Sequence, residues 1–130
     1  MRPVSRLRIE RLKVSLIVID RASGKGIAWG PGIVAGPDLP GRPGLSVIAG
    51  HRDSHMAFLG KVRPGDVVKF TTIDGQDTEY RVSRAMVVDS SRWSPQTNAQ
   101  THGTLYMVTF WPLGGQETTL KRLVVVAGII

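Results

Sequence analysis

The sequence contains no cysteine, which removes disulfides, zinc-thiolate sites and thiol nucleophiles from its chemistry. No hydrophobic run approaches the roughly 20 residues of a membrane-spanning helix, and the longest, residues 123–127, has the length of a buried strand. Like charges never form a block of five, although 17 Lys and Arg against 10 Asp and Glu give a net charge of +7. We therefore interpret the charge as a dispersed basic surface and expect no nucleic-acid partner.

Turn-forming residues are abundant in the chain. It has 15 Gly and 8 Pro among 130 residues, and hydrophobic residues make up 42% of it. This is the composition of a globular protein with many short elements, and the length suits one hydrophobic core. We expect a single domain over residues 1–130.

Short runs of β-branched and aromatic residues, separated by turn residues, predict an all-β fold. Two long loops are expected at residues 24–44 and 89–103, one helical turn at residues 56–59, and a tight hairpin at Asp74-Gly75. So many strands with so little helix favour a closed antiparallel β-barrel of about seven to eight strands with one or two short helical turns. The expected strands are residues 7–9, 14–19, 46–49, 67–72, 78–88, 105–111 and 120–130.

His51 follows an apolar strand and a glycine and precedes Arg52 and Asp53. A histidine held there could act as a general acid or base, because its pKa lies near neutrality. A lone histidine beside an aspartate is more often a hydrogen-bonded structural pair, which is the preferred interpretation if nothing else supports catalysis. The residues alone leave both interpretations open.

The sequence offers residues for two other kinds of site, a metal site and an oligonucleotide-binding surface. His51, Asp53, His55 and His102 offer ligands for zinc or iron, but the turn expected after residue 50 breaks the spacing that one strand face would need. We therefore expect no metal and no cofactor. An oligonucleotide-binding barrel would need interleaved basic and aromatic residues, whereas the three tryptophans are far apart. They are Trp29, Trp93 and Trp111.

Several segments, in order, resemble the sortases, and most closely the compact sortases of Gram-negative bacteria. Residues 47–53, VIAGHRD, resemble the family's histidine region, and residues 105–112, LYMVTFWP, resemble its cysteine region. The other matching segments are residues 7–12, 30–32, 39–44, 63–68 and 121–127. The resemblance covers nearly the whole chain.

The resemblance implies an extracytoplasmic, membrane-anchored enzyme, whose anchor would be a segment not seen in this chain. It implies that a carboxyl-terminal sorting-signal peptide and an amine acceptor are the partners, and that the domain is a monomer. In the family a cysteine attacks the peptide carbonyl, an amine resolves the thioester, histidine handles protons and arginine stabilises the oxyanion. His51 matches the histidine and Arg122 the arginine, while Phe110 occupies the cysteine position.

Phe110 departs from the family at the residue on which the chemistry depends. A benzyl side chain can neither attack a carbonyl nor leave from a thioester. Ser46, Ser54 and Thr104 lie outside the matching motif. The hydroxyl of neighbouring Thr109 should point to the opposite strand face. From the resemblance, Thr109 and Arg122 are nevertheless the residues that we expect to bind substrate.

Two functions remain open at this point. The first is a sortase-family cysteine transpeptidase domain that is a pseudoenzyme in this chain, with Phe110 either natural or introduced. The second is a non-catalytic module that binds the sorting-signal peptide along a strand edge.

Overall fold

The computed structural model describes residues 3–19, 32–35, 45–49, 56–72, 75–89, 91–93, 103–113 and 120–130. The elements are β1 (Pro3–Ile9), η1 (Glu10–Leu12), β2 (Val14–Ile19), β3 (Gly32–Ala35), β4 (Leu45–Ala49), η2 (Ala57–Lys61), β5 (Val67–Thr72), β6 (Asp77–Asp89), β7 (Thr104–Phe110) and β8 (Lys121–Ile129). Both η1 and η2 are short 3-10 helices. The expected all-β class and the helical turn near residues 56–59 are confirmed. No helix within these ranges has the length and hydrophobicity needed to cross a bilayer.

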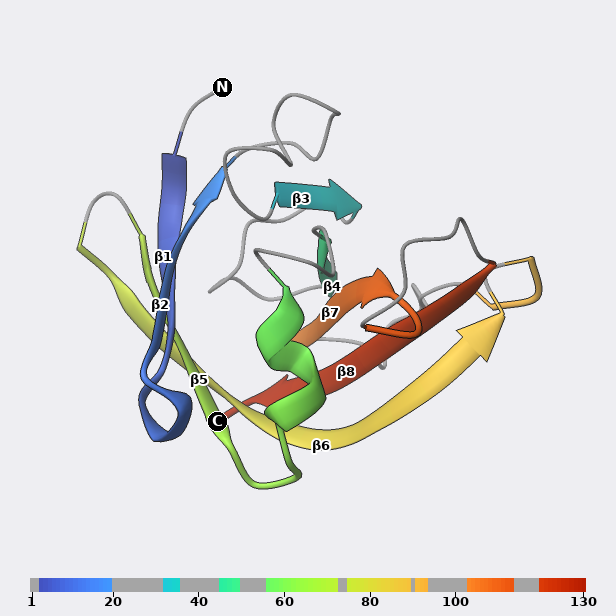
Figure 1. Ribbon diagram of the computed structural model, residues 1–130. Helices are drawn as coiled ribbons and strands as arrows, with labels where there is room; N and C mark the ends of the chain where they lie inside the picture. Colours follow the sequence, from blue (N-terminus) through green and yellow to red (C-terminus); the bar gives the residue numbers. More distant parts are fainter. Residues whose placement is uncertain are drawn as a thin grey trace.

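The strands form one curled sheet in the order β1-β2-β3-β4-β7-β8-β6-β5, and β5 pairs back onto β1 (Figure 1). Most neighbouring strands are antiparallel, but β2 and β3 are parallel, and so are β4 and β7. This corrects the expectation of a purely antiparallel barrel. The chain between β4 and β7 includes two further strands, so it is long enough to bring β7 back in the direction of β4.

Strand β3 lies inside the segment that we expected to be a loop, residues 24–44, and corrects that expectation. It pairs with β4, with Ile33 opposite Ile48. Ile33 and Val34 have the β-branched side chains that suit a strand. Glycines on both sides, at positions 32 and 36, hid this short strand in the sequence.

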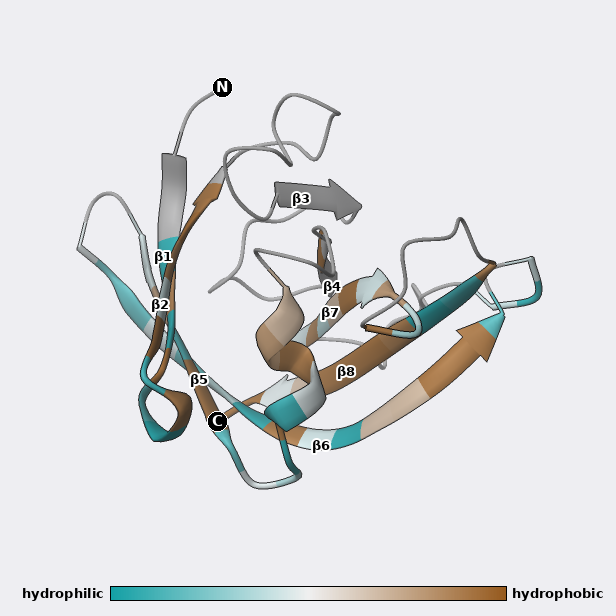
Figure 2. Ribbon diagram, viewed as in Figure 1, coloured by the Kyte–Doolittle hydropathy of each residue, from teal (hydrophilic) through white to brown (hydrophobic). Residues whose placement is uncertain are grey.

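Alternation along each strand decides which side chains enter the core. On β1, Leu7 and Ile9 are fully buried, whereas Arg8 between them lies on the outer face. Phe70 of β5 and Tyr80 of β6 meet inside the barrel, with ring centroids 5.8 Å apart and planes at 87°. This edge-to-face geometry is favoured for aromatic pairs. Figure 2 shows the hydrophobic middle of β8, which runs along the same core.

The hairpin between β5 and β6 is confirmed. Its turn contains Gly75, whose φ of 89° disfavours any residue with a side chain. The Gly75 N–H donates to the Thr72 carbonyl at 2.9 Å, and the Thr72 N–H donates to the Gln76 carbonyl at 2.8 Å.

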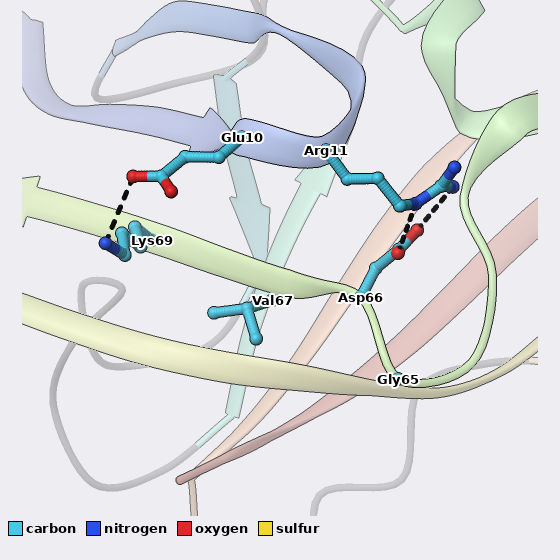
Figure 3. A pocket seen from close by; sticks show the side chains of 6 residues that line it. All are labelled: Glu10, Arg11, Gly65, Asp66, Val67 and Lys69. Carbon is cyan, nitrogen blue, oxygen red and sulfur yellow. Dashed lines mark hydrogen bonds and ion pairs between the residues drawn. The ribbon is translucent and has the colours of Figure 1, made fainter.

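A buried carboxylate joins the turn after β1 to the turn before β5 (Figure 3). Asp66 accepts hydrogen bonds from Arg11 Nε at 2.5 Å and Nη2 at 2.8 Å, and from the Arg63 N–H at 2.8 Å. The side chain of Asp66 is 7% exposed. Its pKa is lowered, chiefly by the hydrogen bond from Arg11 and against the effect of burial.

Replacing Asp66→Asn should lower the free energy of unfolding at pH 7 by about 2 kcal/mol, because Arg11 loses its anion and one of the two acceptor oxygens becomes an NH2 donor. The pKa of Asp66 is lower in the folded state, so its stabilisation is present above the unfolded value of about 3.9 and is lost as pH falls through the folded value. The difference between wild type and variant should therefore shrink on acidification. Urea unfolding at pH 7 and below pH 3.9 measures both effects.

The matched control is Glu79→Gln. Glu79 lies 3.6 Å from Lys69 Nζ, and its side chain is 46% exposed. An exposed pair of this length contributes little. Equal losses of stability in the two variants would contradict a structural role for Asp66.

Candidate functional site

Phe110 and Arg122 lie side by side at adjacent ends of β7 and β8. The two strands are antiparallel, and these residues are directly opposite each other in the register. The Arg122 Cζ atom lies 4.2 Å from the centroid of the Phe110 ring, which is a cation-π contact. Both side chains are half-buried. The structure thus brings together two of the three positions that the sequence predicted for the site.

Both side chains lie on the outer face of the sheet. Met107 of β7 and Leu123 of β8 belong to the main core, and side chains alternate along a strand. Phe110 is three residues from Met107, and Arg122 is one residue from Leu123. Each therefore points away from the core and toward the other.

A second hydrophobic cluster covers this outer face beside the pair. Tyr106, Val124 and Val126 are buried in it, and four half-buried side chains pack on them. These four are Met86, Val88, Trp93 and Val108. Across the sheet, Val88, Arg122 and Phe110 form one row of opposed residues, and Met86, Val124 and Val108 form the next. The candidate site therefore lies beside an apolar surface, which was not predicted from the sequence.

Trp93 is positioned over Tyr106 by the turn that follows β6. Its ring meets that of Tyr106 edge to face, with centroids 5.6 Å apart. The Trp93 N–H donates to the Asp89 carbonyl at 3.0 Å. Asp89 Oδ1 accepts from the Ser91 hydroxyl at 2.6 Å and from the Ser91 N–H at 2.8 Å. The pKa of Asp89 is lowered, chiefly by the hydrogen bond from the Ser91 hydroxyl and then by the one from the Ser91 N–H. The turn is therefore anchored by a carboxylate.

Arg122 has a further contact with its own strand. Its Nη1 donates to the Lys121 carbonyl at 2.9 Å. Together with the Phe110 ring, this bond restricts where the guanidinium can lie. A planar guanidinium held in this way is suited to carboxylate or carbonyl oxygens.

Thr109 does not share the outer face. It is 2% exposed and lies between the outward-facing Val108 and Phe110, so its side chain points to the core side. A contact with a ligand on the outer face would have to come from its main chain.

His51 lies outside the described residues. Strand β4, which precedes it, ends at Ala49, and Ala49 pairs in parallel with Val108 of β7.

The residues of the alternative sites are dispersed or lie elsewhere. Ser54, Asp53, His55, His102 and Trp29 fall outside the described ranges. Within those ranges, no three His, Asp or Glu gather as a metal site would require. Thr104 stands at the far end of β7 from Phe110, and Ser46 is in β4. Trp93 packs on the outer cluster and Trp111 on the main core.

This fold and residue pair define a β-barrel-like domain with an arginine and an aromatic residue opposed on its last two strands. A family model described as "Sortase domain" matches residues 7–130. The chain belongs to the sortase family. No curated protein sequence matches it.

Solved sortase structures share the fold. Listeria monocytogenes sortase A superposes with a TM-score of 0.81 at 18% identity, covering 100% of this chain and 88% of that one. Sortase C-1 from Actinomyces oris gives 0.85 at 24% identity, covering 100% and 74%. A Clostridium perfringens sortase D5 transpeptidase gives 0.82 at 22% identity, covering 98% and 79%.

The contact between Phe110 and Arg122 should be measurable as a coupling energy. We expect the double-mutant cycle of Phe110→Leu and Arg122→Met to give a favourable coupling of about 0.5–1 kcal/mol, because an aromatic ring attracts a guanidinium and a leucine side chain does not. Urea unfolding of the four proteins measures it. Strictly additive effects of the two substitutions would show that the ring and the guanidinium do not interact in solution.

Proposed function

We propose that this domain binds a carboxyl-terminal sorting-signal peptide but cannot form the acyl-enzyme of a transpeptidase. The observation that carries the proposal is the pairing of Phe110 with Arg122, whose ring and Cζ lie 4.2 Å apart at the position where the family resemblance calls for cysteine. A phenyl ring has no lone pair with which to attack a carbonyl and cannot leave as a thiolate. Arg122 can still attract carbonyl or carboxylate oxygens.

We also propose that His51 completes the site beside Phe110. The parallel pairing of Ala49 with Val108 supports this, because two further residues along each strand correspond to His51 and Phe110. In this proposal His51 keeps a hydrogen-bonding role toward the peptide, and without a thiol it has no nucleophile to activate.

In this proposal the peptide binds in an extended conformation on the outer face of the sheet. The half-buried side chains of Met86, Val88 and Val108 border the pair and offer an apolar surface for peptide side chains. As in its family, we expect the domain to act outside the cytoplasm and to be held at a membrane. In this proposal the domain is of the compact, Gram-negative type that its sequence pattern resembles.

A thiol introduced at residue 110 tests directly whether this residue occupies the nucleophile position. Phe110→Cys would be the only cysteine of the chain, because the sequence has none. The guanidinium of Arg122 should stabilise the thiolate, so the thiol pKa should lie below that of an ordinary exposed cysteine. The rate of alkylation by iodoacetamide as a function of pH measures that pKa.

The control for this experiment is Val87→Cys, at a position of β6 that is 46% exposed. Adding Arg122→Gln to Phe110→Cys should return the thiol pKa toward that of the control, and adding His51→Ala should also change the pH profile. If Phe110→Cys and Val87→Cys titrate alike in folded proteins, residue 110 is not at a nucleophile position.

Peptide binding tests the rest of the proposal. We expect the wild-type protein to select peptides from a randomised library without cleaving them, and Arg122→Ala to weaken binding of a selected peptide about tenfold through loss of a charge-assisted hydrogen bond. Arg6→Ala removes the same charge from the exposed face of β1 and should leave binding unchanged. Fluorescence anisotropy measures affinity, and mass spectrometry detects cleavage. Cleavage by the wild-type protein would show an active enzyme and overturn the proposal.

A further inference from the structure

A β-bulge in the middle of β6 changes the face of the sheet to which the following side chains point. Val82 pairs with Ala127 of β8, but Arg84 pairs with Val126, so one extra residue, Ser83, is inserted between them. The Ser83 hydroxyl donates to the Val126 carbonyl at 3.1 Å. This bond satisfies a main-chain group at the place where the regular pairing is interrupted.

The bulge brings two arginines to the same face. In a regular strand, residues 81 and 84 would point to opposite faces, because side chains alternate. Here Val82 is buried in the main core, which places its neighbour Arg81 outside, while Arg84 lies opposite Val126 of the outer cluster. Both arginines are exposed. Their partners, Gly128 and Val126, are two residues apart on β8, a separation of about 7 Å.

An open space lies beside the two arginines. Gly128 is directly opposite Arg81 of β6 and Thr104 of β7. A Cβ atom built on Gly128 would meet no atom within 4 Å. Thr104 precedes the core residue Leu105, so its half-buried side chain lies on the outer face too. In the register of the sheet, two arginines and a threonine thus flank a position that has no side chain.

Nearby carboxylates are engaged elsewhere. Glu79, two residues before Arg81 on the same strand, has its Oε1 3.6 Å from Lys69 Nζ. Asp77 accepts a hydrogen bond from the Thr71 hydroxyl at 2.6 Å. Within the part of the chain that the structure describes, neither Arg81 nor Arg84 has an ion pair. In the described residues, neither guanidinium is therefore held by a carboxylate.

We propose that Arg81, Arg84 and Thr104 bind the phosphate group of a phosphate ester in the space over Gly128. Guanidinium groups bind phosphate oxygens through paired hydrogen bonds, and a hydroxyl adds a donor. The site is distinct from the pair at Phe110, because Gly128 and Arg122 are six residues apart on β8, or about 20 Å. It does not depend on the proposed function.

Isothermal titration with glycerol 1-phosphate tests the site in the full chain. The double variant Arg81→Gln, Arg84→Gln should bind at least about tenfold more weakly, since each charge-assisted hydrogen bond contributes substantially. The double variant Arg6→Gln, Arg92→Gln removes the same charge at two exposed positions elsewhere and should bind as the wild type does.

Gly128→Val distinguishes a specific phosphate site from nonspecific electrostatic attraction. It keeps every charge, has room for its side chain and suits a strand, but it fills the proposed phosphate position. We expect at least about a fivefold loss of affinity, with thermal unfolding as the check on the fold. If Gly128→Val binds normally, or both double variants lose affinity equally, the charge acts only at long range and the site does not exist.

Vesicles of phosphatidylglycerol, compared with vesicles of phosphatidylcholine, distinguish the source of the phosphate. Binding of glycerol 1-phosphate with the predicted dependence on Arg81, Arg84 and Gly128 supports a soluble or polymeric phosphate ester. Binding of phosphatidylglycerol vesicles alone, with the same dependence, supports a lipid headgroup. Binding of neither probe overturns the proposal.

Discussion

The pairing of β8 with both β6 and β7 is the constraint on which the rest of the structure depends. Because β8 lies between the two other strands, its register fixes which side chains share a row on either face. A slip of one residue would turn Arg122 into the core and Leu123 out to solvent. Burial of Leu123, Val125 and Ala127 on the inner face therefore also holds Arg122 opposite Phe110.

The part of the sheet around β8 is covered on both faces, which explains the composition of that strand. Residues 123–127 of β8 form a continuous apolar run, because alternate side chains pack in the main core and in the outer cluster. Strand β1 has a solvated outer face instead, so it alternates apolar Leu7 and Ile9 with Arg6 and Arg8. The candidate site lies where the covered part of the outer face ends.

Local pattern was sufficient to predict most strands but not their pairing. Alternation identified β1 and β5, and Asp74-Gly75 identified the hairpin between β5 and β6. The parallel pairing of β4 with β7 joins segments more than 50 residues apart, and neither segment carries a local sign of it. The bulge at Ser83 was missed for the same reason, since the sequence around it alternates no differently from a regular strand. The side of the sheet reached by Arg84 therefore could not be predicted.

The candidate site was predictable only where a family resemblance supplied the long-range information. Nothing in the residues around Phe110 or Arg122 indicates that they meet, and composition alone would assign one to packing and the other to solvent. Their contact follows from the antiparallel register of the last two strands, which a resemblance to whole sortases carries implicitly. The prediction that His51 belongs to the site depends on the same resemblance.

A phenyl ring in the place of a thiol changes what the neighbouring arginine can do. Beside a thiolate, a guanidinium is attracted to a full negative charge and shares it with the developing oxyanion. Beside Phe110 it meets the weaker quadrupole of the ring, which orients the guanidinium without neutralising it. In the proposed function, this contact leaves the charge of Arg122 in place, and a carbonyl or carboxylate oxygen of the peptide would be attracted to it. The proposed function therefore separates two requirements of the site, because bond making needs a nucleophile at residue 110, whereas binding needs the charge of Arg122.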